Sequence, residues 1–206
     1  FTNITKTSED KKRNIYYKQQ ITRNASKNEF QNIKDYLKSL KITVTKYLDS
    51  KKFVERVAQL SQRTNQFNLT SKRYTKNEIY RFIVAKKAMV FAISVNDKFG
   101  DFGVTGIAIC KINGNNTAVI DTFALSCRIL GRDIEKIFIN IILIELKKKK
   151  IKTVFAHYLK TKKNIQVVNF YDECGFKLNE QNKNEKKYSI ELKSFRINKI
   201  NYIIIN

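Results

Sequence analysis

The feature that most constrains the fold is a long apolar stretch with a period of two. Apolar residues alternate over 88–125, with interruptions at Asp97-Lys-Phe-Gly100 and Asn113-Gly-Asn-Asn116. Such alternation predicts half-buried strands, and the two interruptions have the composition of hairpin turns. We therefore expect three consecutive antiparallel strands, over 88–95, 103–111 and 117–125.

The turn after the third of these strands is the candidate functional element. Cys127 and Arg128 follow the strand, Gly131 comes three residues later, and a helix with one apolar side is expected over 132–149. A strand that leads into a helix in this way leaves backbone N–H groups unpaired near the positive end of the helix dipole. The turn therefore predicts a seat for a phosphate or pyrophosphate, with a cysteine beside it.

Helices and strands are also expected on both sides of this stretch. Before it we expect a helix opened by a Ser26/Glu29 capping box and ending near Leu40, a short strand at 42–44, a helix over 50–63, and a helix from a Thr75/Glu78 capping box to about Ala85. After it we expect a strand at Val154–Ala156, a helix over about 164–173 that ends at Gly175, strands near 176–179 and 187–193, and an apolar tail at 200–205 that can add a strand. Residues 1–40 are expected to be a helical interdomain arm or linker, and 41–206 a single domain.

The chain is strongly basic. Its 41 Lys and Arg against 18 Asp and Glu give a formal net charge of +23. Two interpretations stay open: compositional bias in a chain that is rich in Lys, Asn and Ile, or an acidic partner. Nucleic acid is not the expected partner, because neither a stacking platform of aromatic residues nor a continuous basic stripe is evident. Three widely spaced cysteines form no CxxC pair, so no disulfide framework or metal site is indicated.

The location of the chain is constrained by its hydropathy. No apolar run approaches the length of a membrane span, and the chain opens at Phe1 with a polar stretch in place of a signal segment. We therefore expect a fragment of a longer cytoplasmic protein that makes no membrane contact.

The element order resembles the GCN5-related N-acetyltransferase (GNAT) fold, and two motifs support this. Arg128-x-x-Gly131-x-Asp133 is similar to the GNAT pyrophosphate loop, with Asp in its last small position, and Phe170-Tyr-Asp-Glu-Cys-Gly-Phe176 is similar to a GNAT segment near the C-terminus. The resemblance implies an α/β (α+β) fold with a mixed, mostly antiparallel sheet of about seven strands and flanking helices. In that fold strands four and five splay apart, and pantetheine lies in the gap.

Four blocks resemble one subfamily more closely. They are 59–74, 97–103, 125–132 and 161–164, and they are similar to the C-terminal domain of FkbH-like proteins over about residues 10 to 195. Members pair an upstream phosphatase domain of the haloacid-dehalogenase (HAD) superfamily with this acyltransferase-like domain. They are associated with transfer of glyceryl from 1,3-bisphosphoglycerate to an acyl carrier protein, which begins methoxymalonyl units for polyketides. Two alternatives stay open: a GNAT N-acetyltransferase that uses acetyl-CoA on an amine, and a non-catalytic module that docks a carrier protein.

Three residues are catalytic candidates under the resemblance. Cys127 is either an acyl-accepting nucleophile, favoured as thiolate by the helix N-terminus and by Arg128 and Arg132, or a small core residue. His157, the single histidine, is expected to face Cys127 across the splay as a general base, or to be an ordinary polar residue at a strand end. Tyr171 matches the tyrosine that protonates the leaving thiolate in GNAT enzymes, or it packs in the core.

The binding candidates form two groups. Phosphopantetheine of a carrier protein, or coenzyme A, is expected at Arg128, Leu130, Gly131, Arg132, Asp133 and Asn164. Asp133 favours the carrier-borne group, which brings one phosphate in place of a pyrophosphate, and Asn164 is alternatively a helix N-cap. A polar loop is expected over the acyl pocket, where its amides and hydroxyls suit a hydroxylated acyl group, or it is only a capped turn. Its candidates are Asn65, Gln66, Asn68, Thr70 and Arg73, with Phe67 and Leu69 as core anchors.

Overall fold

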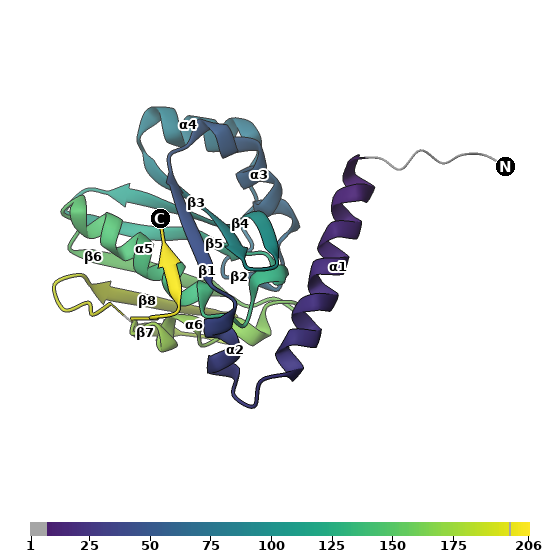
Figure 1. Cartoon of the computed structure of the whole chain (residues 1–206). Coiled ribbons are helices and arrows are strands. Elements are labelled where there is room, and N and C mark those ends of the chain that lie inside the picture. The colour runs from purple at the N-terminus through teal and green to yellow at the C-terminus, as the bar shows by residue number, and fades with distance from the viewer. Residues whose placement is uncertain (1–7, 198) are drawn as a thin grey trace.

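A mixed sheet of nine strands forms the centre of the molecule (Figure 1). The computed structural model describes residues 8–197 and 199–206. Along the sheet the strands follow the order β7-β8-β6-β5-β4-β3-β1-β9, and β2 pairs with β5 off this path. The α/β class and the mostly antiparallel sheet are as predicted, and β2 and β9 raise the expected seven strands to nine.

The helices are α1 (Ser8–Asn28), α2 (Ile33–Ser39), α3 (Val54–Arg63), α4 (Lys76–Ala85), α5 (Ile134–Lys148) and α6 (Phe170–Glu173). The strands are β1 (Ile42–Leu48), β2 (Phe67–Asn68), β3 (Ala88–Asp97), β4 (Gly100–Asn113), β5 (Thr117–Leu125), β6 (Thr153–Leu159), β7 (Lys177–Gln181), β8 (Glu185–Glu191) and β9 (Ile203–Ile205).

Helices cover both faces of the sheet, so the core has two layers. On one face α5 and α6 bury an aromatic cluster that includes Phe123, Phe138 and Phe170. On the other face α3 and α4 pack residues such as Val57 and Ile79 against β3, β4 and β5. Because both faces are covered, β3, β4 and β5 are buried on both sides along most of their length, and not on one side only as a period of two predicts.

Two capping boxes before β3 were predicted to open helices, and the structure confirms one of them. Thr75 caps α4 as predicted: its Oγ1 accepts from the Glu78 N–H, and the Glu78 carboxylate accepts from the Thr75 N–H at 2.8 Å. The Ser26/Glu29 box was wrong, because α1 continues through Ser26 to Asn28. The next helix, α2, is capped instead by Asn32, whose Oδ1 accepts from the Lys34 N–H at 2.8 Å.

The predicted helix over 164–173 is also corrected. A 3-10 turn at Ile165–Val167 precedes a short α6 at Phe170–Glu173. Asn164 does not cap this segment, because its side chain is hydrogen-bonded to the backbone of other elements. At the C-terminus the apolar tail forms β9, which pairs in parallel with β1, as the sequence suggested.

Strands β5 and β6 splay apart, as the resemblance implied. They pair in parallel from Thr117 opposite Thr153 to Ile120 opposite Ala156, and no further. At that point β5 carries a β-bulge, because Asp121 has no partner in β4. The bulge redirects the second half of β5, which opens a gap between two strands that run in the same direction.

Helix α1 lies along one side of the molecule (Figure 1). Arg23, near its C-terminal end, is buried and forms an ion pair with Asp97 at 2.7 Å. Its guanidinium also lies 4.2 Å from the centroid of the Phe102 ring. The helical part of the expected 1–40 arm is therefore fixed to the sheet, while residues 1–7 lie outside the described residues. Its role as a link to another domain stays a prediction.

Within residues 8–197 and 199–206, every helix is too short or too polar to cross a membrane.

Candidate functional site

The gap between β5 and β6 is filled by the chain itself. Strand β2 pairs with the end of β5, with Phe67 opposite Leu125 and Asn68 opposite Ala124. The Leu69 N–H then donates to the Phe123 carbonyl at 3.1 Å. On the other side, the Leu69 carbonyl accepts from the N–H of Leu159, in β6, at 2.7 Å. Residues Phe67–Thr70, which we call the bridging segment, thus connect the two splayed strands.

Side chains hold the bridging segment in place. Thr70 Oγ1 donates to the carbonyl of Asp121 at 2.8 Å, at the bulge of β5. Asn164 Nδ2 donates to the carbonyls of Asn68 and Leu159, both at 2.9 Å. Asn164 Oδ1 accepts from the Thr161 N–H at 2.8 Å. Thr70 and Asn164, which were expected to face a ligand, are instead buried, and their side chains are hydrogen-bonded to the backbone.

Asn68 has the same structural role. Its Oδ1 accepts from the N–H groups of Thr70 and Ser71, and its Nδ2 donates to the Thr64 carbonyl. The side chain is therefore part of the loop that supports β2. This arrangement corresponds to the capped-turn alternative for Asn68, and the predicted anchors Phe67 and Leu69 are buried in the core as expected.

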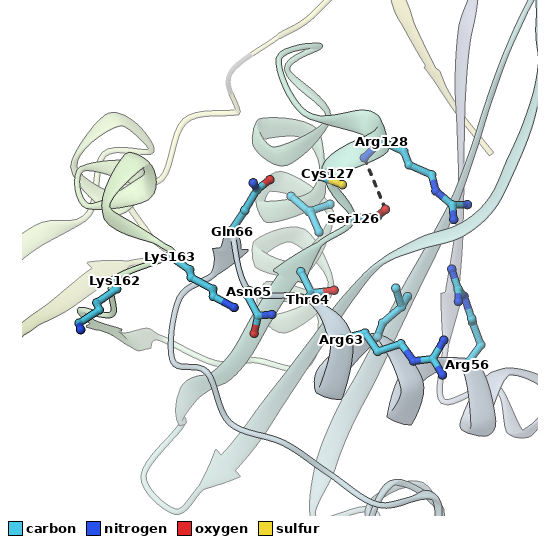
Figure 2. Close-up of a pocket in the computed structure, with 12 residues that line it drawn as sticks. Arg56, Arg63, Thr64, Asn65, Gln66, Ser126, Cys127, Arg128, Lys162 and Lys163 are labelled. Carbon is cyan, nitrogen blue, oxygen red and sulfur yellow. Dashed lines mark hydrogen bonds between the residues drawn. The ribbon is translucent and has the colours of Figure 1, made fainter. Parts of the chain in front are cut away.

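A large cavity opens beside the bridging segment (Figure 2). Its volume is about 710 Å³, and it lies between the end of α3, the turn after β5 and the loop after β6. Of the predicted site residues, Asn65, Gln66, Cys127 and Arg128 meet here. Its walls are Arg56, Leu60, Arg63, Thr64, Asn65, Gln66, Leu125, Ser126, Cys127, Arg128, Lys162 and Lys163. We call it the cationic cavity.

The lining of the cationic cavity carries five basic side chains and no carboxylate. Figure 2 shows the guanidinium groups of Arg56, Arg63 and Arg128 extending toward the same side. Burial lowers the pKa of Arg56, and the positive charges of Arg128 and Arg63 lower it further. Five basic side chains gathered in one cavity without a carboxylate favour an anionic ligand.

Three cysteines differ sharply in accessibility. Cys127 is exposed and begins a 3-10 turn, Cys127–Ile129, at the wall of the cationic cavity. Cys110 is fully buried, which raises the pKa of its thiol. Burial also raises the pKa of Cys174, to about 12. Because the thiolate is the nucleophile, Cys127 is the one of the three whose position suits acyl chemistry.

The turn before α5 differs from the predicted phosphate seat. Arg132 is 8% exposed and lies over the Phe102 ring at 4.9 Å, away from the cationic cavity. Asp133, at φ 58°, accepts from Lys136 Nζ at 2.8 Å and from the Tyr202 hydroxyl. A carboxylate and the C-terminal segment therefore occupy the start of α5. Leu130 is half-buried against the core and Gly131 is exposed, and neither lines the cavity.

These findings bear on where coenzyme A can bind. The gap that holds pantetheine in the GNAT fold contains the bridging segment, and the start of α5 carries the Asp133 carboxylate. The residues present therefore do not fit coenzyme A in that position. Arg128 is the residue of the predicted loop that lines the cationic cavity, and its guanidinium lies 4.8 Å from the Tyr16 ring of α1.

His157 lies apart from Cys127. It lines a smaller cavity of about 230 Å³ at the other end of the bridging segment, together with Thr70 and Asp121. Its Nδ1 is 3.0 Å from Glu185 Oε1, so its ring is oriented by that carboxylate. The expected Cys–His pair across the splay is therefore not formed, because the bridging segment occupies the space between the two strands.

Asp121 is a buried charge that was not among the predicted site residues. Lys72 and Lys111 approach its Oδ1 at 2.8 and 2.7 Å, and the Tyr74 hydroxyl donates to its Oδ2. Burial raises the pKa of Asp121, but the bonds from Lys111, Lys72 and Tyr74 outweigh burial and lower it overall. A lone carboxylate in an otherwise apolar strand was the available signal.

Replacing Asp121 with Asn is expected to make the free energy of unfolding depend less on pH in the acid range. The pKa of Asp121 is lower in the folded chain than its unfolded value of about 4, so the carboxylate stabilises the fold at pH values above about 4. This contribution to the free energy of unfolding is lost as the pH falls through the folded pKa. Urea unfolding from about pH 7 to about pH 3 measures this. Asp101→Asn, in the exposed β3–β4 hairpin, is the control. An unchanged slope below about pH 4 in Asp121→Asn would contradict the assignment.

Tyr171 lines neither cavity. Its side chain is 1% exposed and packs between the rings of Phe176 and Tyr188, at 4.9 and 5.4 Å. Its hydroxyl has no hydrogen-bond partner among the described residues, and burial raises its pKa well above the usual value. The packing alternative describes its position.

Several residues of the cationic cavity were missed. Arg56 and Arg63 are seven residues apart on α3, which places them on one side of the helix. Lys162 and Lys163 belong to the 161–164 block but were not selected, and Arg73 supports the site indirectly by donating to Asn65 Oδ1 at 3.0 Å. The described residues include no group of three or more His, Cys, Asp or Glu side chains that could hold a metal.

Comparison with known proteins shows the fold. No protein-family model matches the chain, and no curated protein matches it. A chimera of the Vibrio cholerae spermidine N-acetyltransferase SpeG and hSSAT is similar, with a TM-score of 0.57 and 15% identity over 73% of this chain and 96% of that one.

Two further structures were solved with coenzyme A. The PaiA N-acetyltransferase from Thermoplasma acidophilum has a TM-score of 0.52 and 17% identity over 73% of this chain and 98% of its own. A Bacillus subtilis acetyltransferase has a TM-score of 0.53 and 10% identity over 72% of this chain and 98% of its own. The described chain therefore has the GNAT acetyltransferase fold.

Proposed function

We propose that the chain is an acyltransferase domain in which Cys127 accepts an acyl group inside the cationic cavity and passes it to a second thiol. The observation that carries the proposal is an accessible thiol in a cavity with five basic side chains and no carboxylate. The resemblance to FkbH-like proteins supports glyceryl from 1,3-bisphosphoglycerate as the acyl group. It also supports the phosphopantetheine thiol of an acyl carrier protein as the acceptor, with an HAD phosphatase domain upstream.

The chemistry is a transfer in two steps. The Cys127 thiolate attacks the carbonyl carbon of the acyl phosphate, the carbon–sulfur bond forms, the carbon–oxygen bond breaks, and inorganic phosphate leaves. With 1,3-bisphosphoglycerate the product is a 3-phosphoglyceryl thioester, and water on the upstream phosphatase domain would hydrolyse its remaining phosphate ester to give glyceryl and inorganic phosphate. Arginine and lysine side chains stabilise the negative charge of the donor and of the departing phosphate. In the second step another thiolate attacks the thioester, takes the acyl group and releases the Cys127 thiolate.

The amides beside Cys127 suit a hydroxylated acyl group. Asn65 and Gln66 line the cationic cavity, and each amide can both donate and accept a hydrogen bond. The Arg73 guanidinium donates to Asn65 Oδ1, so the Asn65 NH₂ group is left to donate to a ligand. Such a pair favours a glyceryl group over an acetyl group, which carries no hydroxyl.

The test is covalent labelling of Cys127. The 206-residue chain is incubated with 1,3-bisphosphoglycerate and examined by intact-protein mass spectrometry and peptide mapping. We expect one 3-phosphoglyceryl adduct on Cys127, lost in Cys127→Ser and kept in the control Cys174→Ser, because Cys174 is half-buried and does not line the cationic cavity. An undiminished adduct in Cys127→Ser would overturn the role of this residue.

A GNAT N-acetyltransferase that uses acetyl-CoA on an amine is the second candidate. The similar structures support it more directly than glyceryl transfer, since they are acetyltransferases and two were solved with coenzyme A. It predicts saturable acetyl-CoA binding by calorimetry and acetylation of an amine with Cys127 unmodified. Under either candidate the partners stay proposals. An acidic carrier protein would suit the formal charge of +23.

A further inference from the structure

We infer that the bridging segment permanently fills the gap between β5 and β6, where pantetheine lies in the GNAT fold. It thereby excludes coenzyme A from the gap and leaves the cationic cavity as the route by which a thiol reaches Cys127. The exclusion rests on the geometry of the gap alone. The route to Cys127 rests in addition on the proposed function.

Several backbone groups that an extended ligand would use are already paired with the bridging segment. A linear chain of amides binds beside a strand through the strand's free N–H and carbonyl groups. On β5 the carbonyls of Asp121 and Phe123 accept from Thr70 and Leu69, and the pairing of β2 covers Ala124 and Leu125. On β6 the Leu159 N–H donates to Leu69. The bridging segment therefore bonds to both walls of the gap.

The bridging segment is also part of the core. Phe67, Asn68, Leu69 and Thr70 are 5%, 1%, 0% and 5% exposed. The Phe67 ring meets the Phe170 ring edge-on at 5.1 Å. A ligand in the gap would have to expel two apolar side chains and break the bonds from Thr70 and Asn164, so displacement would mean partial unfolding of the core.

The second attachment point of coenzyme A is altered as well. A pyrophosphate at the start of α5 would meet the Asp133 carboxylate, which is already held by Lys136 and Tyr202. Arg132, the residue before Asp133, lies over Phe102 instead. Both halves of a coenzyme A site are thus occupied by groups of this chain.

Hydrogen exchange combined with coenzyme A titration tests the exclusion on the whole chain. We expect the amides of Leu69 and Leu159 to be protected as strongly as those of central strands, and to stay so with millimolar coenzyme A. Binding without loss of protection would also agree, because the ligand would then sit outside the gap. Saturable binding with deprotection of Leu69 and Leu159 would overturn the inference, as would rapid exchange of both amides without ligand.

Asn164→Ala tests what holds the bridging segment. Losing both Nδ2 bonds is expected to speed exchange of the Leu69 amide about tenfold or more, while the β3 and β4 amides stay protected. Asn179→Ala, an exposed asparagine on β7, is the matched control. If Asn164→Ala does not fold, Thr70→Val removes the bond to Asp121 at nearly constant volume and is expected to act in the same direction. Unchanged exchange at Leu69 in the variant tested would contradict the role of that side chain.

The outcomes separate this inference from the proposed function. A closed gap without any adduct on Cys127 would remove the acyl-transfer proposal and leave the exclusion of coenzyme A standing. An adduct on Cys127 together with displacement of the bridging segment by coenzyme A would do the reverse.

Discussion

Replacing Arg23 with Leu is expected to lower the free energy of unfolding by about 3–5 kcal/mol. Arg23 Nε and Nη2 donate to the two carboxylate oxygens of Asp97 at 2.7 and 2.9 Å, and both side chains are excluded from water. Removing the guanidinium leaves the Asp97 carboxylate buried without its cation, which costs more than the pair contributes. Asp97 cannot turn away easily, because it also accepts from the N–H groups of Phe99 and Gly100.

Urea unfolding of Arg23→Leu beside the unchanged chain measures this loss. The control is Asp35→Ala, which breaks an exposed pair with Lys38 and is expected to change the free energy of unfolding by about 1 kcal/mol or less. The double variant Arg23→Leu/Asp97→Leu is expected to recover part of the loss, since no buried charge is left alone. A change below about 1 kcal/mol in Arg23→Leu would show that α1 is not anchored as described.

Reversing two charges of the cationic cavity is expected to slow acylation of Cys127 by about 10²- to 10⁴-fold. The double variant is Arg63→Glu/Lys163→Glu. Neither side chain has an ion pair within the described part of the chain, so each is available to a phosphate. One hydrogen bond between charged groups contributes about 1.5–3 kcal/mol, or about 10- to 100-fold in rate, and the variant removes two.

Adduct formation is followed by mass spectrometry against donor concentration at fixed salt. The control, Lys152→Glu/Lys177→Glu, makes the same change of net charge at exposed positions outside the cavity. We expect at most a small decrease in the control, from weaker long-range attraction of the donor. Equal decreases in both double variants would mean that the cavity has no specific part in binding.

The parts of the fold that depend on neighbouring residues were predictable. The alternation over 88–125 gave β3, β4 and β5 nearly at their observed bounds, because a period of two and turn residues are local properties. The cap at Thr75 is local in the same way. At Ser26 a similar motif failed, because α1 extends through it and the motif alone cannot say whether a helix is starting or already under way.

The arrangement of the site depended on contacts between distant residues. Arg23 and Asp97 are 74 positions apart, and Asn164 reaches Asn68 across 96. The loop at 64–70 was correctly predicted to contain core anchors, but no local pattern shows that Leu69 inserts between two splayed strands. Cys127 and His157 do lie on the expected elements. Their separation follows from that insertion, which no short-range signal reveals.

The most direct test of Cys127 as an acyl carrier is transfer of the acyl group from the isolated Cys127 thioester. The chain is labelled on Cys127 with acyl phosphate, freed of donor by gel filtration, and mixed with a carrier protein that bears phosphopantetheine. If Cys127 carries the acyl group between donor and carrier, label leaves Cys127 and reaches the carrier thiol at equal rates, with the Leu69 amide protected throughout. Label that stays on Cys127, or carrier labelled only while free donor is present, would contradict it.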